Sequence, residues 1–266
     1  MNKPTINWVL QSNLTKEEDA KRIKAALQAP NTLWEEIQII PFSHQLPDLQ
    51  HQADVHIPYG STTLVLSAYA HPLYKKGLFY DPATFNVATY AEKWGQTLLN
   101  HQGQLVRFGA VEKIPSSTDQ AWFIRPNHDT KTFSGQVLSF QDLLAWRDKI
   151  CALELPDLNA DSEVWMAPPQ DIQKEWRIFI VDDQIISAGR YLDQGALSPS
   201  QADLPEEMLA FVRDRIKEYR LHDAYVMDIA LTSQGFSLIE CNCFNGTGFY
   251  QHDIAAIVQA VNGLFG

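Results

Sequence analysis

The sequence predicts a fold of mixed α/β and α+β class. Short apolar runs alternate with amphipathic helical patterns over about the first hundred residues, which favours a small α/β unit. Later in the chain, two pairs of apolar runs are each joined by a tight polar turn, and this pattern predicts two β-hairpins. Helical patterns with good start signals stand between the strand patterns, so we expect helices packed on sheets.

Composition narrows the class of partner. The chain has 266 residues, 45% of them hydrophobic and 20% charged, as expected of a soluble globular protein. Its net charge of −11 argues against nucleic-acid and membrane partners, because both depend on basic patches. The N-terminal sequence lacks the apolar core of a secretory signal, and no apolar run reaches the roughly 18 residues of a membrane helix, so we expect a cytoplasmic protein. Composition does not define the oligomeric state.

Residues 1–102 form the first expected unit. A capping box, Thr15-x-x-Glu18, predicts a helix over about 15–29. Buried strands are expected at 6–10, 37–40 and 64–66. The turn-rich loop at 58–63 is of a kind that often binds ligands, although a plain turn is the simpler interpretation.

Residues 103–169 and 170–266 form the second and third expected units. In the second unit, a capping box at Ser139-x-x-Asp142 begins a helix that reaches Cys151, and strands are expected at 105–108, 122–124 and 164–166. In the third unit, the expected elements are a hairpin at 176–191, a helix from Pro205, a hairpin at 225–242 and a helix from about Asp253.

The hairpin at 225–242 carries the strongest chemical signal. With a turn centred near Gln234, Asp228 faces Glu240, and Asn242 lies two residues farther along on the same face. Like charges opposite each other destabilise a sheet, so we expect a positive group between them. Two carboxylates and an amide oxygen suit a hard cation such as Mg²⁺. The two cysteines of this hairpin are expected to face the core: Cys241 and Cys243.

The hairpin at 176–191 carries a second charged cluster. A two-residue turn at 182–183 pairs residue 175 with residue 190, so Glu175, Arg177 and Arg190 share one face. Two interpretations are open: a surface ion pair of little energetic weight, or an arginine fork that receives phosphate or carboxylate oxygens. The pattern alone favours the surface ion pair.

A third cluster follows the strand at 122–124. Arg125 ends that strand, and 127–135 is a polar loop that contains Lys131. Such a loop can fold over a phosphate chain with its backbone amides, and Lys131 would add a point charge. The loop lacks the spacing of a P-loop, so taken alone it is most simply an ordinary exposed loop.

These three clusters, in this order, resemble the ATP-grasp superfamily, and within it a bacterial and phage branch of small ATP-grasp domain proteins. The segments that carry the resemblance are FIRPNHDTKTFSG, VWMAPPQDIQKEWRIFIVDDQIISAGRY and YVMDIALTSQGFSLIECNCFNGTGFY. The resemblance covers most of the chain, and its D…ExN pattern is the most specific element. It implies the ATP-grasp fold, with an N-terminal α/β unit followed by two α+β subdomains that clamp ATP between their sheets.

The resemblance implies a role for each charged cluster. Asp228, Glu240 and Asn242 match the positions that hold Mg²⁺, so Asp228 would contact the nucleotide through the metal. Arg125 lies where many members of the superfamily carry a lysine that reaches the nucleotide phosphates. This departure leaves open whether Lys131 shares that work.

The resemblance also implies an activity and the path of the nucleotide. Met166 and Ala167 fall where the hinge backbone binds adenine, and Glu175 and Arg177 lie along the path from ribose to phosphate. The implied enzyme is an ATP- and Mg²⁺-dependent ligase that joins the carboxylate of a small molecule or peptide to an amine or thiol through an acylphosphate. Arg177 and Arg125 would stabilise the transferred phosphoryl group. Two alternatives stay open: an ATP-grasp kinase that phosphorylates a small acceptor, and a non-catalytic nucleotide-binding module.

Overall fold

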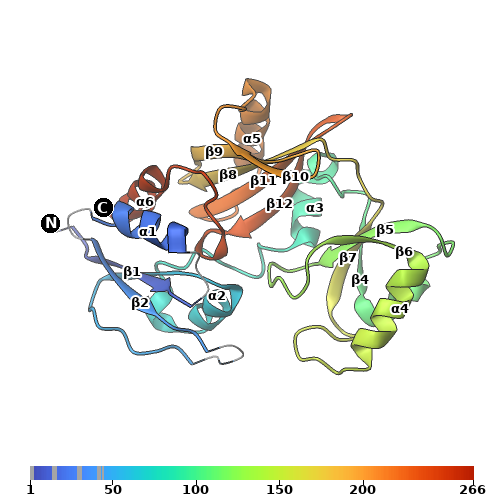
Figure 1. The fold of residues 1–266 in the computed structure, drawn as a ribbon, viewed down its shortest axis with the longest axis horizontal. Helices are drawn as coiled ribbons and strands as arrows, with labels where there is room; N and C mark the ends of the chain where they lie inside the picture. Colours follow the sequence, from blue (N-terminus) through green and yellow to red (C-terminus); the bar gives the residue numbers. More distant parts are fainter. Residues whose placement is uncertain (1–2, 14–16, 29–31, 41–42, 44) are drawn as a thin grey trace.

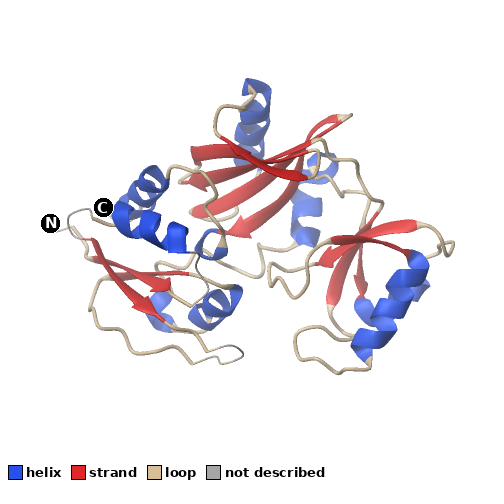
Figure 2. Cartoon of the chain, in the orientation of Figure 1, coloured by secondary structure: helices blue, strands red, loops and turns tan. Residues whose placement is uncertain are grey.

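Three sheets lie across the molecule (Figure 1). The structure is a computed structural model that describes residues 3–13, 17–28, 32–40, 43 and 45–266. The strand orders are β2-β1-β3, β4-β7-β5-β6 and β10-β9-β8-β11-β12. Helices pack beside each sheet (Figure 2), so the predicted mixed class is confirmed.

The first sheet is parallel and belongs to the N-terminal unit. β1 lies between β2 and β3 and pairs with both. The elements are β1 (Ile6–Gln11), α1 (Glu17–Ala26), β2 (Thr32–Ile37), β3 (Val55–Tyr59), α2 (Thr62–Tyr69), η1 (Pro72–Tyr74), α3 (Val87–Trp94) and η2 (Gly95–Thr97). The strand predicted at 6–10 is confirmed, whereas the one predicted at 37–40 begins where β2 ends. The capping box at residue 15 and the helix end predicted at residue 29 lie outside the described residues.

The strand predicted at 64–66 is wrong, because these residues lie within α2. Ser61 caps this helix, and its Oγ accepts a hydrogen bond from the backbone N–H of Leu64 at 3.3 Å. A short buried apolar run has no period that separates helix from strand, which explains the error. The sequence analysis also missed β3. That strand contains Pro58, which argues against a central strand but is tolerated here at the edge of the sheet.

The second sheet is antiparallel and has its own core. The strands predicted at 105–108, 122–124 and 164–166 and the helix after Ser139 are confirmed. The elements are β4 (Gln104–Arg107), η3 (Phe108–Lys113), β5 (Ala121–Pro126), β6 (Gln136–Ser139), α4 (Phe140–Cys151) and β7 (Glu163–Ala167). The Oγ of Ser139 accepts from the backbone N–H of Asp142 at 3.1 Å. Ile124, Leu143 and Met166 are fully buried between this sheet and α4.

The third sheet is antiparallel and is covered on both faces. Its elements are β8 (Lys174–Val181), β9 (Gln184–Asp193), β10 (Ala196–Ser200), α5 (Glu206–Glu218), β11 (Ala224–Thr232), β12 (Gly235–Cys243), η4 (Phe244–Gly246) and α6 (Ile254–Gly263). Both predicted helices are confirmed, the last one capped by Asp253, whose carboxylate accepts from the N–H of Ala256 at 3.0 Å. Ile178 packs in the core that α5 covers, and Phe179 packs in the core that α6 covers. The two hairpin cysteines are buried, as predicted.

The first and third sheets share a core. Trp8 of β1 is fully buried in one cluster with Val226 of β11 and Val258 of α6, and its ring N–H donates to Oδ1 of Asn262 at 2.9 Å. Helix α1 packs beside α6, close to both ends of the chain (Figure 1). The N-terminal unit and the third sheet therefore form one packed body, to which the second sheet is attached. In the described part of the chain, no helix is long and apolar enough to cross a membrane.

Candidate active site

The predicted acidic cluster forms at one end of the β11–β12 hairpin. Asp228 is paired with Glu240, as predicted. Next to the turn, Ile229 is paired with Leu238, so Ile239 is an extra residue in β12, a β-bulge that shifts the register by one. The side-chain amide of Asn242 donates to one oxygen of each carboxylate, at 3.1 Å in both cases. The structure thus brings all three predicted metal ligands together.

Each carboxylate of this cluster is paired with an arginine. Arg177 of β8 lies opposite Asp228, and its guanidinium donates two hydrogen bonds to the Asp228 carboxylate, at 2.9 and 2.7 Å. Arg125 comes from β5 in the second sheet and donates to Glu240. The positive groups expected between the two carboxylates are therefore arginines, and one of them bridges the two sheets.

Burial and these arginines set the charge of the cluster. Asp228 is 1% exposed, and burial raises its pKa, although the paired Arg177 opposes the shift. Burial also raises the pKa of Glu240, but Arg125 and the Asn242 amide outweigh it and hold that pKa below its usual value. Glu240 is therefore ionised at neutral pH and can accept a cation in place of Arg125.

Two tyrosines hold Arg177 from the side away from Asp228. The guanidinium lies 5.5 Å from the ring centre of Tyr191 and 5.1 Å from that of Tyr250. The Tyr191 hydroxyl donates to Glu175, and burial of Glu175 raises its pKa. Arg177 is therefore part of a buried network rather than a surface ion pair. The sequence analysis missed both tyrosines, and their aromatic character next to the charged segments was the only available signal.

Arg190 does not join this network. The pairing predicted between residues 175 and 190 is wrong: Trp176 lies opposite Arg190, because the register of β8 and β9 shifts between Glu175 and Trp176. Arg190 consequently lies on the opposite face from Arg177. There it is paired with Asp203 at 2.8 Å and with a neighbouring aspartate.

A cavity of about 490 Å³ opens in front of this cluster. Charged residues from both sheets line it, among them Arg125, Lys131, Glu175 and Glu240. Its apolar lining comes from Leu99, Phe123, Val137, Ile172 and Ile239. The cavity therefore combines a charged end with an apolar end, between two sheets.

Met166 and Ala167 lie at the end of β7, at the start of the link to β8. Both side chains are fully buried and do not line the cavity. Pairing of β7 with β4 ends at Met166, opposite Gln104, so Ala167 is the first residue beyond that ladder. Gln170 and Ile172 of the same link do line the cavity.

The basic loop at 127–135 is fixed at its beginning. The backbone carbonyl of Asn127 accepts from the N–H of Val87 at 2.8 Å, at the start of α3. Asp129, which the sequence analysis missed, accepts from the N–H of Cys243 at 2.9 Å, and burial raises its pKa to about 6. Lys131 is exposed, 3.5 Å from the carbonyl oxygen of Gly246. The first residues of the loop are therefore attached to both neighbours, while its basic side chain is available.

Two sheets from different parts of the chain that enclose a charged cavity, with paired acidic residues at the end of a hairpin, define a protein of the ATP-grasp fold. A family model described as an ATP-grasp domain, the third family of its clade, matches residues 44–261, and the chain belongs to this family. The resemblance found in the sequence is thereby confirmed.

Several solved structures have a similar fold. D-cycloserine synthetase DcsG is 10% identical, with a TM-score of 0.64 and coverage of 98% of this chain and 100% of that one. The ATP-grasp ligase PsnB, complexed with precursor peptide PsnA2 and AMPPNP, is 14% identical, with a TM-score of 0.56 and coverage of 100% and 99%. D-alanine–D-alanine ligase from Bacillus anthracis is 10% identical, with a TM-score of 0.56 and coverage of 98% of both chains. No curated protein matches the chain.

Proposed function

We propose that this protein is an ATP-dependent ligase that joins a carboxylate to an amine or thiol and forms ADP and phosphate. The observation that carries the proposal is the junction of Arg125, from one sheet, with Glu240 and its partners, from the other, at the charged end of a cavity. Similar folds belong to proteins named as a ligase of D-alanine, a synthetase of D-cycloserine and a ligase that takes a precursor peptide. These names support a ligase, and the partners would be a small-molecule or peptide carboxylate and an amine or thiol.

The acidic cluster fits Mg²⁺. Asp228, Glu240 and the amide oxygen of Asn242 are hard oxygen donors within one hydrogen-bonded group, and Mg²⁺ usually takes one or two carboxylates and fills its other positions with phosphate and water. A bound Mg²⁺ would supply positive charge against the phosphate oxygens. Arg177 and Arg125 would then release the carboxylates and turn to the phosphates.

The cavity accommodates a nucleotide in one direction. Adenine would lie at the apolar end, against the backbone of Met166 and Ala167, and the ribose would lie near Glu175. The phosphates would reach Lys131 and the arginines at the charged end. ATP-grasp proteins clamp ATP in this manner, and we propose that residues 103–169 form the part that closes on the rest.

The chemistry asks the protein mainly for position and charge. An oxygen of the substrate carboxylate attacks the γ-phosphorus, the bond to the bridging oxygen of ADP breaks, and an acylphosphate forms. The amine or thiol then attacks the acyl carbon, loses a proton and displaces phosphate. Arg177 and Arg125 would stabilise the charge that develops on the phosphoryl oxygens, and the 127–135 loop would exclude water from the acylphosphate.

The test begins with calorimetry of ATP binding with and without Mg²⁺. A pool of carboxylic acids and amines is then added, and ADP and free phosphate are measured separately. A ligase releases both in equal amounts, whereas a kinase releases ADP and leaves the phosphate on the acceptor. Absence of Mg²⁺-dependent ATP binding would exclude both enzymes. We expect the reaction in the cytoplasm, where ATP and Mg²⁺ are available.

A further inference from the structure

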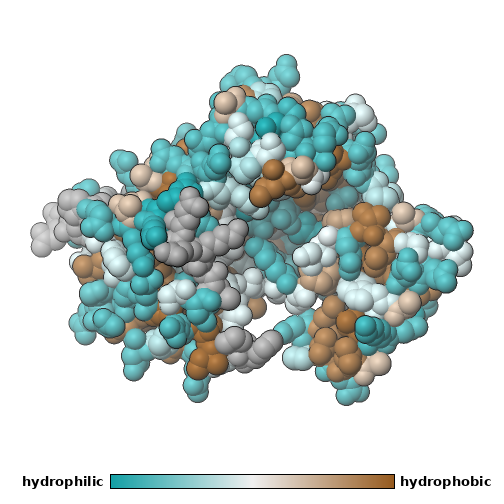
Figure 3. Space-filling model, viewed as in Figure 1, coloured by the Kyte–Doolittle hydropathy of each residue, from teal (hydrophilic) through white to brown (hydrophobic). Residues whose placement is uncertain are grey.

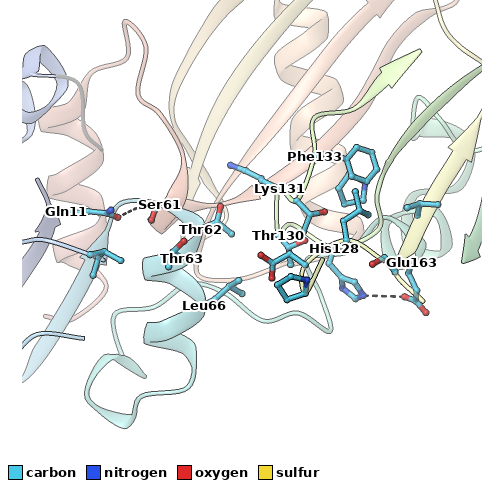
Figure 4. A pocket seen from close by; sticks show the side chains of 18 residues that line it. Gln11, Ser61, Thr62, Thr63, Leu66, His128, Thr130, Lys131, Phe133 and Glu163 are labelled. Carbon is cyan, nitrogen blue, oxygen red and sulfur yellow. Dashed lines mark hydrogen bonds and ion pairs between the residues drawn. The ribbon is translucent and has the colours of Figure 1, made fainter. Parts of the chain in front are cut away.

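A second and larger cavity, of about 880 Å³, lies between the N-terminal unit and the second sheet. Figure 3 shows the surface hollowed between these two parts, and Figure 4 shows side chains from both parts facing across it. Four residues line this cavity and the first one alike: Pro126, His128, Lys131 and Phe133. The basic loop is therefore a shared wall, and a ligand in the second cavity would lie next to the charged end of the first.

One wall of the second cavity suits an anionic group. It is formed by the first residues of α2 and presents the hydroxyl groups of Ser61, Thr62 and Thr63. Ser61 is already engaged, since its N–H donates to Oε1 of Gln11 at 2.8 Å and its Oγ caps the helix. Within the described ranges, the N–H groups of Thr62 and Thr63 have no acceptor. Lys131 extends from the opposite loop toward this wall (Figure 4), so amide, hydroxyl and ammonium donors converge.

The other wall suits a cationic group. Glu163 and Asp157 line it with their carboxylates. Glu163 accepts from the amide of Asn127 at 3.1 Å and lies 3.3 Å from Nε2 of His128, so it is held in place. The imidazole Nδ1 of His128 is buried and has no partner among the described residues. Between the two walls the lining is apolar: Ile39, Leu66, Phe133, Pro156, Leu158 and Val164.

We propose that this cavity is the acceptor site and that it takes a short peptide with free ends. The inference rests on the proposed ligase function. The carboxylate of the peptide would lie between α2 and Lys131, beside the place of the γ-phosphate, and is the group that is activated. Its ammonium group would lie at Glu163 and Asp157, and its side chains would contact the apolar lining. Ligand pockets are about 300–1,000 Å³, so the volume exceeds the need of a single amino acid and favours a peptide.

The test uses a pool of tripeptides with free ends, a second pool acetylated at the N-terminus, and a pool of single amino acids. Hydroxylamine replaces the unknown nucleophile and converts the acylphosphate to a measurable hydroxamate. We expect saturable hydroxamate formation with the free tripeptides. We expect a KM at least about fivefold higher for the acetylated tripeptides, since the carboxylate of Glu163 would lose its charged partner.

Two isosteric variants locate the ends of the peptide. Thr62→Val should raise the KM of both tripeptide pools. Glu163→Gln should raise the KM of the free pool at least about fivefold and leave that of the acetylated pool unchanged. Both variants should bind MgATP like the wild type in calorimetry, because neither residue lines the first cavity. Thr118→Val and Glu92→Gln change exposed residues and serve as matched controls.

The outcomes separate this inference from the proposed function. Failure to bind MgATP would overturn the ligase itself. Normal MgATP binding, with no hydroxamate from any peptide pool, would overturn the peptide assignment alone. So would equal KM values for free and acetylated tripeptides in the wild type and in Glu163→Gln, or single amino acids that match the tripeptides.

Discussion

The two carboxylates of the site are buried as ion pairs, and this determines how each should respond to substitution. Arg177 makes a bidentate contact with Asp228, and Arg125 pairs with Glu240 across the two sheets. Removal of one partner from a buried pair leaves the other charge uncompensated, which costs more than the pair contributes. Conservative variants are therefore the informative ones.

Arg177→Lys should lower turnover by at least about tenfold, because an ammonium cannot reproduce the two parallel contacts of the guanidinium. The measurement is the steady-state rate of ADP release at saturating MgATP. Arg213→Lys changes an exposed ion pair on α5 and should behave like the wild type. Wild-type kinetics in Arg177→Lys would contradict a role in the transfer.

Glu240→Gln should weaken ATP binding by about tenfold or more in the presence of Mg²⁺, because it removes one of two anionic ligands. Calorimetry with ATP in EDTA supplies the comparison, since the metal-free nucleotide does not use Glu240 in this way. An equal loss under both conditions would assign Glu240 to Arg125 alone and not to the metal.

His252 predicts the response of stability to acid. It is 3% exposed, its Nδ1 is hydrogen-bonded to Ser187 Oγ at 2.8 Å, and burial, with the charges of Arg177 and Arg22, lowers its pKa to about 4. The folded state therefore binds this proton less readily than the unfolded state. The stability that His252 contributes is present above its usual pKa near 6.5 and is lost as pH falls toward 4.

The expected loss is about 3 kcal/mol between pH 7 and pH 4. In His252→Gln, the fall in unfolding free energy over this range should be smaller by that amount, measured by urea denaturation. His101→Gln, at a half-exposed position, should leave the pH dependence unchanged. A slope in His252→Gln equal to that of the wild type would refute the assignment.

Among the site residues, the sequence predicts those whose proximity is local. Asp228, Glu240 and Asn242 lie on one hairpin, so strand period and turn position suffice. Tyr250 and Asp129 could not be found this way, because they reach the site from loops distant in sequence. The position of a loop depends on tertiary packing, which no local pattern contains.

At the scale of the element, hairpin registers show both success and failure. The Asp228–Glu240 pairing holds only because a bulge at Ile239 supplies the extra residue. In the β8–β9 hairpin a register shift has the opposite effect and moves Arg190 to the other face. Bulges are not visible in residue patterns, so a side-chain face can be predicted with assurance only near the turn.

Helix starts are predicted well, since the capping residue and its acceptor are adjacent in sequence. Ser139→Ala should destabilise the protein by about 1 kcal/mol, because the N–H of Asp142 loses its acceptor. Urea denaturation followed by circular dichroism measures the effect. Ser117→Ala, at an exposed position, is the control, and equal stability of the two variants would show that the cap contributes nothing.

At the scale of the molecule, the division into cores predicts how it moves. The second sheet and α4 have their own core, whereas the first and third sheets share theirs. The nucleotide cavity lies where the separate core meets the rest. Closure is therefore expected as a movement of residues 103–169 against one larger body, with little change inside either.

A ligand that binds both parts should stabilise the whole. At a concentration about 100 times its Kd, MgATP should add about 2.7 kcal/mol to the free energy of unfolding. Thermal denaturation with MgATP, and with ATP in EDTA, tests this and should show the higher midpoint only with the metal. Equal midpoints would mean that the metal does not take part in joining the two parts.

The core shared by β1 and α6 joins segments at opposite ends of the described chain. During synthesis β1 leaves the ribosome early, yet Trp8 gains its partners Val226 and Val258 only when nearly the whole polypeptide has emerged. At usual rates of translation this interval is roughly 10 to 50 seconds. Over that time the apolar face of the first strand is incompletely covered, and nascent chains of this protein are candidates for chaperone binding until the last helix docks.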